Sequence, residues 1–142
     1  MVKPTTVCLV LSFALCSGWP IHQIDIQNAF LHGTLTEVVY ITQPPGFIHP
    51  QHQSHVCKLH KALYGLKQAP WAWFSRLSSK LIQLGFISSL LDTSLFISHS
   101  TDYLMLVLIY VDDIIITFFS HVVIQSLLQE LHNDFAVKDL GH

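Results

Sequence analysis

The stretch LIYVDDIIIT, residues 108–117, places two adjacent carboxylates, Asp112 and Asp113, inside an otherwise apolar run. An ionised carboxylate in apolar surroundings is costly unless it is paired or bound to a cation. Either the pair caps an exposed turn, or a positive charge lies beside it. The apolar segments on both sides predict two strands, Tyr103–Val111 and Ile114–Phe118, joined as a hairpin with the two aspartates at its turn.

The composition indicates a heavily buried globular chain. Hydrophobic residues make up 51% of the 142 residues and charged residues 11%, which excludes disorder and suits one domain. So few charges leave little for a solubilising surface, which favours a part of a larger protein. The net charge of −2 excludes a general polyanion binder, although five of the seven Lys and Arg residues lie between positions 58 and 80. Three cysteines without a CxxC spacing favour free thiols in a reducing compartment.

The first 18 residues, MVKPTTVCLVLSFALCSG, allow two interpretations. A lysine, a short apolar core and small residues are typical of a secretory signal, whereas an apolar run that ends at Gly18 is typical of a buried helix over residues 6–17. Because the rest of the chain is typical of an intracellular protein, we expect the helix and an intracellular location. The longest apolar run, Leu104–Val111, is far below the ~20 residues that a membrane-spanning helix needs.

The other elements follow from periodicity and from the Pro and Gly positions. One helix begins at Pro70 and ends before Gly85, and a last helix follows Ser120 as its N-cap. Their predicted core faces are Trp73, Leu77, Leu81 and Leu84 in the first, and Ile124, Leu127, Leu128, Leu131 and Phe135 in the second. Further strands are predicted at His22–Ile26, Val38–Thr42, Val56–Leu59 and Leu95–Ser98, a helical turn at Asn28–Gly33 and a loop over residues 43–55. This order, without strict βαβ alternation, predicts an α+β fold with an antiparallel sheet backed by helices.

A third aspartate bears on how the hairpin pair is interpreted. Asp is common in turns, so Asp112 and Asp113 alone are a weak signal. The segment IHQIDIQNAFLHG, however, places Asp25 in the middle of another predicted strand. A strand carboxylate beside a hairpin pair suits two divalent cations, because Mg²⁺ prefers oxygen ligands and shares its remaining sites with water and phosphate. Two such ions activate an attacking hydroxyl and stabilise the leaving oxygen in phosphoryl transfer.

Six motifs, in this order, resemble one known family. They are DIQNAFLHG, VVYITQPPGF, VCKLHKALYGLKQAPWAWF, SLLDTSLF, YVDDIIIT and FAVKDLG. Together they resemble the palm region of a copia-type (Pseudoviridae) LTR-retrotransposon reverse transcriptase, over about Thr5 to Gly141. The resemblance implies one partial reverse-transcriptase domain over residues 1–142, a palm with part of the fingers. The thumb, ribonuclease H and integrase regions of the Pol polyprotein are expected to be missing.

The resemblance also implies roles for the acidic residues. Asp25 and Asp112 match the metal-binding catalytic carboxylates, and Asp113 matches a weaker third member beside them. These residues are implied to bind two Mg²⁺ ions, with Mn²⁺ as an alternative ion, for transfer of a nucleotide to a primer 3′-hydroxyl. Lys138 in KDLG matches a general acid that protonates pyrophosphate. Tyr110 is similar to the residue that flanks the primer terminus.

Other matched positions are implied to contact nucleotide or template. Phe30 is similar to the family's steric gate against ribonucleotides. Gly65 is similar to a glycine that lets the backbone approach the nucleotide, because a Cβ would intrude there. Lys67 and Gln68 are implied to lie near template or nucleotide.

The implied partners are an RNA or DNA template with its primer, dNTPs and the missing Pol regions, in a cytoplasmic particle or the nucleus and not in a membrane. An alternative is a catalytically inert, degenerate remnant with no independent activity. For the chain by itself we expect inactivity, because it lacks the parts that hold primer and template.

Four positions depart from the family pattern. They are Cys8 and Trp71 in place of Arg, Val38 in place of Glu and Phe118 in place of Gly. A glycine required at positive φ costs about 1 kcal/mol to replace, so strain is expected at Phe118.

Two clusters have competing explanations. Three lysines, Lys58, Lys61 and Lys67, suit phosphate contacts, whereas Arg76 and Lys80 are expected simply to be solvated on a helix. A second cluster suggests zinc by its ligand types, but its spacing matches no known zinc motif and we expect no structural zinc there; it comprises His49, His52, His55, Cys57 and His60.

Overall fold

The structure is a computed structural model that describes residues 2–141, and the chain folds into two compact units. Unit 1 comprises Met1–Ala29 and Leu77–His142, and unit 2 comprises Phe30–Arg76. The predicted α+β class, with an antiparallel sheet backed by helices, is confirmed. That the whole chain acts as one domain stays a prediction.

Unit 1 is built on a six-stranded sheet in which every pair of neighbours is antiparallel. In spatial order its strands are β4 (Ile87–Ser88), β5 (Leu95–His99), β6 (Leu104–Tyr110), β7 (Asp113–Phe118), β1 (Ile21–Ile26) and β8 (Val137–Gly141). The predicted strands at β1, β5, β6 and β7 are confirmed to within about one residue, and the edge strands β4 and β8 lie outside the predicted strands. The isoleucines of β1 and β7 form the centre of the core; Ile24, Ile26, Ile114 and Ile116 are buried.

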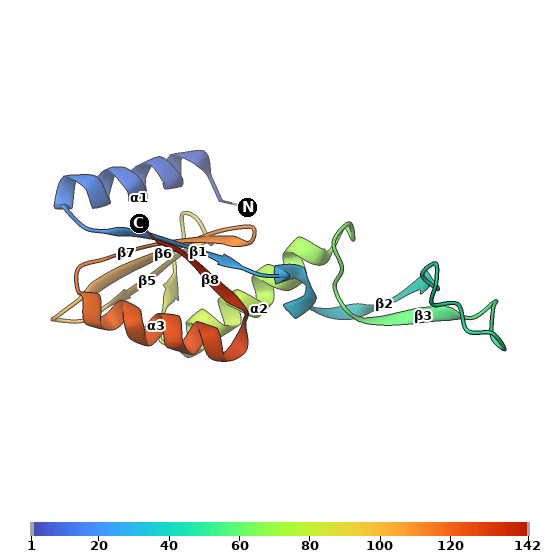
Figure 1. Cartoon of the computed structure of the whole chain (residues 1–142). Helices are drawn as coiled ribbons and strands as arrows, with labels where there is room; N and C mark the ends of the chain where they lie inside the picture. The colour runs from blue at the N-terminus through green and yellow to red at the C-terminus, as the bar shows by residue number, and fades with distance from the viewer. Residues whose placement is uncertain (1, 142) are drawn as a thin grey trace. The chain divides into compact units, whose positions relative to one another are not determined.

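Helices cover both faces of this sheet. Figure 1 shows α1 (Pro4–Ser17) on one face and α3 (His121–Asp134) on the other. The expectation that α1 is a buried helix is wrong, because its opposite face, with Leu9 and Leu15, is exposed. Its buried face is Thr6, Val10 and Ala14. The helix ends as predicted at Gly18, whose φ of 67° closes the last turn by hydrogen bonds to Ala14 and Leu15.

Two details of the predicted helix ends need correction. Ser120 occupies the N-cap position of α3, but its side chain forms no capping hydrogen bond. Phe135 is buried as expected, yet it lies just beyond the helix, and its N–H bonds to the Leu131 carbonyl at 2.8 Å. Ile124, Leu127 and Leu131 form the buried face of α3.

Lys80 is not solvated, contrary to expectation. It lies on α2 (Ala69–Gln83) and is buried, with its Nζ 3.1 Å from Asp134 and 3.4 Å from Glu130 on α3. These pairings raise the pKa of Lys80, above all the hydrogen bond to Asp134. A long lysine stem can cover apolar surface while its charged end stays paired. The position of Lys80 on the polar side of its helix therefore does not predict whether the side chain is buried.

Unit 2 contains a two-stranded sheet of β2 (Thr34–Thr42) and β3 (Val56–Lys61), preceded by the 3-10 turn η1 (Ala29–His32) and followed by the start of α2. The predicted loop over residues 43–55 joins the two strands. Gly33 is closely packed, because a Cβ there would lie 2.9 Å from the Ala72 carbonyl carbon and from the Trp73 nitrogen. Among residues 2–141 no helix has the length and apolarity to cross a bilayer.

Candidate active site

Four of the predicted site residues form one row across four neighbouring strands. Tyr110 on β6 pairs with Asp113 on β7, Asp113 pairs with Asp25 on β1, and Asp25 pairs with Lys138 on β8. Directly paired residues project from the same face of an antiparallel sheet. The row Tyr110–Asp113–Asp25–Lys138 is therefore contiguous on one face of unit 1.

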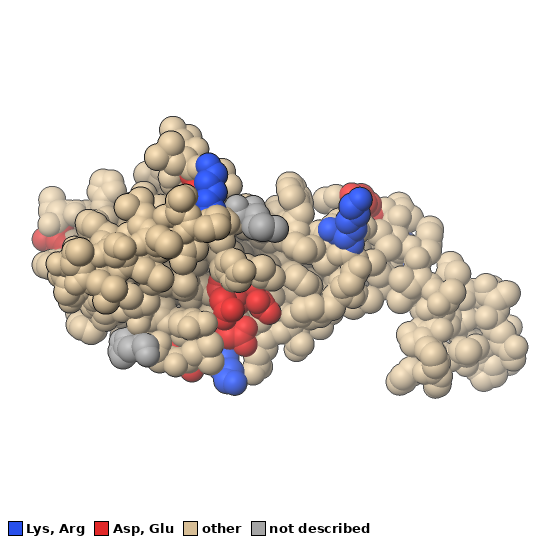
Figure 2. Space-filling model, turned by 90° about the horizontal axis from the view of Figure 1, so that it is seen from above, with Lys and Arg blue, Asp and Glu red and all other residues tan. Residues whose placement is uncertain are grey.

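This face is the polar side of an alternating pattern. Ile24 and Ile26 on β1 are buried on the opposite face, while Asp25 between them is only partly buried. The same alternation places Ile114 in the core and Asp113 outside it. Figure 2 shows acidic side chains gathered and open to solvent on one face of the molecule.

Asp112 and its neighbour Val111 form the turn itself. The structure corrects the expected hairpin slightly, because Asp113 already belongs to β7 and pairs with Tyr110. The Ile26 N–H donates to the Asp112 carbonyl at 3.1 Å, which ties the turn to the end of the strand that carries Asp25.

The expected strain lies at Val111 and not at Phe118. Val111 has a φ of 55°, whereas Phe118 is absent from the positive-φ residues and lies buried inside β7. Of the two turn residues, Val111 and Asp112, only Val111 has a positive φ. A hairpin turn with positive φ at its first residue favours glycine at that position. The hairpin therefore bends at the turn, and Phe118 simply fills the core.

Gln23 is a site neighbour that is not among the predicted site residues. Its Nε2 donates to Asp113 Oδ1 at 3.2 Å from the adjacent strand. The signal was present, since Gln23 is two positions before Asp25 and therefore shares its face. This bond fixes one oxygen of Asp113 and leaves the other for a further partner.

The donor chemistry fits a hard divalent cation. Two carboxylates directly opposite each other repel unless a positive charge lies between or beside them. Asp25, Asp113 and Asp112 offer only oxygen donors, the kind that Mg²⁺ prefers, with waters and phosphates as further ligands. Within residues 2–141, however, no three His, Cys, Asp or Glu side chains already converge on one point that could hold a metal.

The other predicted contact residues belong to unit 2. The Phe30 ring is nearly buried and packs on the exposed Tyr64 ring, 4.5 Å between centroids. Gly65 has a φ of 92°, and a Cβ there would meet no atom of the chain within 4 Å. Within this chain, glycine is therefore favoured at position 65 by its backbone conformation and not by lack of space. Lys67 is exposed, and Gln68 Nε2 donates to Glu37 Oε2 at 3.4 Å.

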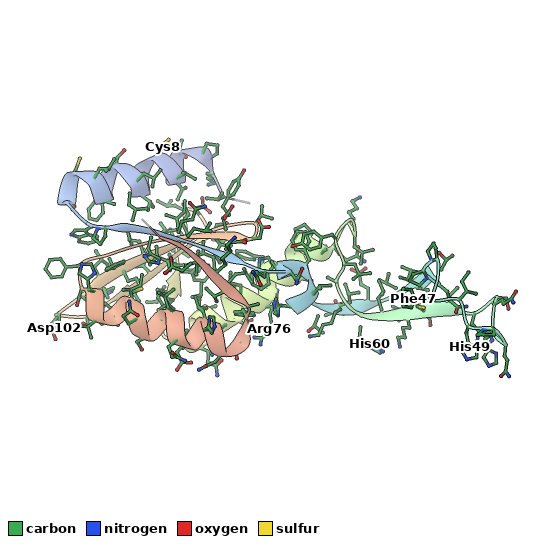
Figure 3. All side chains as sticks on the ribbon, viewed as in Figure 1. Cys8, Phe47, His49, His60, Arg76 and Asp102 are labelled. Carbon is green, nitrogen blue, oxygen red and sulfur yellow. The ribbon has the colours of Figure 1, made fainter. Side chains whose placement is uncertain are left out.

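The histidine-rich loop is organised by Gln43. Its side chain donates to the carbonyls of His52 and His55, at 2.7 and 2.9 Å, and accepts from the His49 N–H at 2.8 Å. The rings of His52 and His55 stack with centroids 4.5 Å apart, and the His49 ring lies tilted by 32° against His52, 4.9 Å between centroids. Figure 3 shows Phe47 and His49 near the tip of this hairpin, and Cys8 on the outer side of α1.

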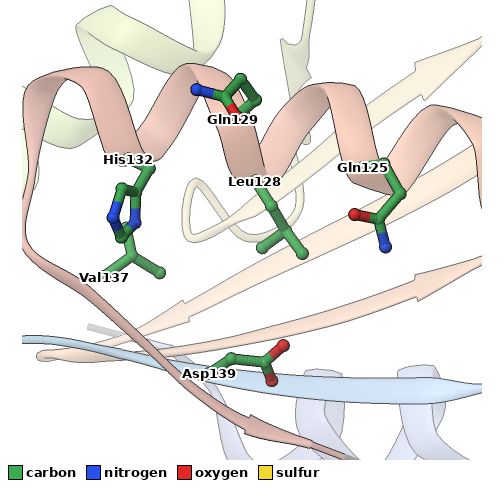
Figure 4. A pocket seen from close by; sticks show the side chains of 6 residues that line it. All are labelled: Gln125, Leu128, Gln129, His132, Val137 and Asp139. Carbon is green, nitrogen blue, oxygen red and sulfur yellow. The ribbon is translucent and has the colours of Figure 1, made fainter.

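A second polar feature of unit 1 lies on the other face of the sheet. A hollow of about 260 Å³ between α3 and β8 is lined by Gln125, Leu128, Gln129, His132, Val137 and Asp139 (Figure 4). Asp139 pairs in register with Ile24, so it faces away from Asp25, and its Oδ1 lies 2.7 Å from His22 Nε2. This hollow is separate from the aspartate row.

The α+β fold and the row of carboxylates suit an enzyme class that handles phosphates with divalent cations. A family model described as reverse transcriptase (RNA-dependent DNA polymerase) matches residues 1–142, and the chain belongs to this family. The resemblance to copia-type transposon reverse transcriptases is thereby confirmed.

Similar proteins include the Retrovirus-related Pol polyproteins from transposons RE1 and RE2 of Arabidopsis thaliana, 48% and 45% identical over 139 residues. A third, from transposon TNT 1-94 of Nicotiana tabacum, is 36% identical over 142 residues. The matches cover 98%, 98% and 99% of this chain but 10%, 10% and 11% of those proteins. The chain thus spans about a tenth of the length of these curated relatives.

Proposed function

We propose that this chain is the palm, with part of the fingers, of a retrotransposon RNA-directed DNA polymerase. The observation that carries the proposal is the direct pairing of Asp25 with Asp113, next to the turn that bears Asp112. Adjacent acidic groups that solvent can reach are the arrangement that two-metal nucleotidyl transfer requires.

Asp25, Asp112 and Asp113 are the residues that would hold two Mg²⁺ or Mn²⁺ ions. When bound, such ions lower the pKa of the primer 3′-hydroxyl and neutralise charge on the phosphates. The chain's own contribution is positioning: Gln23 holds Asp113 through a 3.2 Å hydrogen bond, and the Asp112 carbonyl accepts from the Ile26 N–H. Tyr110, at the end of the row, flanks the primer terminus, and Lys138 supplies a proton to the leaving pyrophosphate.

The distribution of charge supports a nucleic-acid partner. Unit 1 has three basic and eight acidic side chains, which gives a net charge of −5. Unit 2 has four basic side chains and one acidic side chain, which gives a net charge of +3. A basic unit suits phosphate contacts, and an acidic unit needs cations before a polyanion can approach. Lys58, Lys61 and Lys67 of unit 2 would supply salt-dependent grip.

Unit 2 also provides the residues proposed to select the nucleotide. Phe30, supported by Tyr64, acts as the steric gate against a 2′-hydroxyl. Gly65, Lys67 and Gln68 contact template or nucleotide, with the dNTP and primer–template as substrates. The thumb and ribonuclease H regions of a Pol polyprotein are the proposed protein partners.

Primer extension with Mg²⁺ and dNTPs tests the proposal. We expect no extension by the chain by itself, extension when a separately expressed thumb region is supplied, and loss of that extension by at least about 100-fold in Asp25→Asn and Asp112→Asn. Asp102→Asn, at an exposed turn, is the matched control and should retain activity. Extension that survives Asp112→Asn would overturn the proposal. Absence of both extension and primer–template binding at micromolar protein would favour the inert remnant.

A further inference from the structure

The basic side chains of unit 1 are few, and two of the three are occupied. Lys3 Nζ donates to the Leu91 carbonyl at 2.7 Å. Lys80 is buried and pairs with acidic side chains of α3. Among the Lys and Arg side chains that the structure describes in this unit, Lys138 remains, exposed on β8.

Lys138 stands next to the acidic pair by strand register. Asp25 has Asp113 as its direct partner on one side and Lys138 on the other. Side chains of direct cross-strand partners leave the sheet on the same face, with Cβ atoms about 4.5–5.5 Å apart. One ammonium group and two carboxylates therefore follow one another across three strands, and the flexible lysine stem can reach the nearer carboxylate.

We propose that Lys138 is the counter-ion of Asp25 and Asp113 until divalent cations bind, and that these cations displace its ammonium group. This inference rests on the proposed function. Like charges directly opposite each other destabilise a sheet, so one neighbouring positive charge stabilises the metal-free pair. A divalent cation repels the ammonium group and takes over the same carboxylate oxygens. The displaced ammonium group is then available to the negatively charged pyrophosphate, so one side chain serves the resting and the reacting states in turn.

Titration of Mn²⁺ into the full 142-residue chain, followed by the EPR signal of the free ion, tests this exchange. Lys138→Met keeps most of the stem and removes the charge. In the wild type the displaced Lys138 ammonium group and the bound Mn²⁺ ion repel each other. Removing this repulsion between charges about 7 Å apart should tighten Mn²⁺ binding about fivefold to tenfold. In EDTA the same variant should unfold at a lower temperature than the wild type, because the acidic pair has lost its counter-ion.

Lys58→Met is the matched control, since it removes the same charge from an exposed strand residue of unit 2. Neither Mn²⁺ affinity nor the unfolding temperature in EDTA should change in the direction seen for Lys138→Met. Lys138→Gln provides a second neutral variant should Lys138→Met fail to fold, and the same tightening is expected.

The two possible failures are distinguishable with Asp25→Asn. If Mn²⁺ binding to the wild type does not depend on Asp25, both the metal site and the counter-ion proposal are overturned. If binding depends on Asp25 but is unchanged or weaker in the Lys138 variants, the counter-ion proposal alone is overturned, and the proposed function stands.

Discussion

Lys3 and Asp92 are joined across 89 positions of the chain: the main-chain N–H of Lys3, the N-cap residue of α1, donates to Asp92 Oδ2 at 2.8 Å. The same buried carboxylate accepts a bond from the Ser94 N–H at 3.0 Å and another from the Thr6 side chain. One acidic group thus anchors the first turn of α1 to the segment before β5.

This anchor predicts a pH-dependent stability. Burial raises the pKa of Asp92, but the hydrogen bonds from Lys3, Thr6 and Ser94 lower it more, so its pKa lies below the usual 3.8. Because the folded pKa is the lower one, the stabilisation is present above the unfolded value and is lost as pH falls through the folded pKa. We expect Asp92→Asn to lower the free energy of unfolding by about 1–3 kcal/mol at pH 7. Urea unfolding at pH 7 and at pH 3 measures the difference, which should shrink at the lower pH; an equal loss at both would contradict the account.

Val111 predicts a stabilising substitution in the hairpin. A β-branched residue at positive φ is strained, and glycine relieves that strain at a cost of more entropy in the unfolded chain. Val111→Gly should therefore raise the free energy of unfolding by about 0.5–1 kcal/mol. Val122→Gly, in the exposed face of α3, is the control and should destabilise by about 0.3–0.5 kcal/mol. Thermal unfolding compares them, and equal destabilisation by both would show that Val111 is relaxed.

Gly33 predicts a packing constraint in unit 2. A methyl group there would lie 2.9 Å from the backbone of α2, which cannot move aside cheaply. Gly33→Ala should destabilise the chain by about 2–3 kcal/mol. Gly46→Ala has open space around its Cβ and loses only its favourable φ of 85°, so about 1 kcal/mol is expected. Denaturant titration measures the free energy of unfolding of both variants. If Gly33→Ala is as stable as Gly46→Ala, the close approach of Gly33 to the backbone of α2 is refuted.

If the proposed function holds, Phe30 should select deoxynucleotides over ribonucleotides. Phe30→Ala should lower the ratio of kcat/KM for dNTPs over rNTPs by at least about tenfold, because the ring no longer excludes a 2′-hydroxyl. Phe47→Ala, at a largely exposed position of the same unit, is the control. Single-nucleotide incorporation with both sugar types gives the ratio. An unchanged ratio in Phe30→Ala would remove the gate assignment.

The residue types of the site were predictable from the sequence, but their partners were not. Alternation of apolar and polar residues in IHQIDI and in DIIITF indicates which face Asp25 and Asp113 occupy. It says nothing of which strands pair or in what register. β8, with the sequence VKDLG, has no apolar alternation of its own and is a strand because it pairs with β1.

Long-range polar contacts explain the other differences. Lys80 and Asp92 are buried because of partners 50 and 89 positions away, which no local pattern reveals. The nearly uniform apolar sequence of α1 carries no polar stripe, so it could not indicate that one face is exposed. The division into two units was not expected either, since no linker or composition change marks residues 30 or 76.

The spatial meeting of Asp25 and Asp113 at a metal site is most directly tested by a crystal structure with Mn²⁺. The account predicts an anomalous-scattering peak within coordination distance of both carboxylates, on the face that carries Tyr110 and Lys138. Asp25 and Asp113 on opposite faces of the sheet, or a Mn²⁺ ion bound elsewhere with this pair uncoordinated, would contradict it.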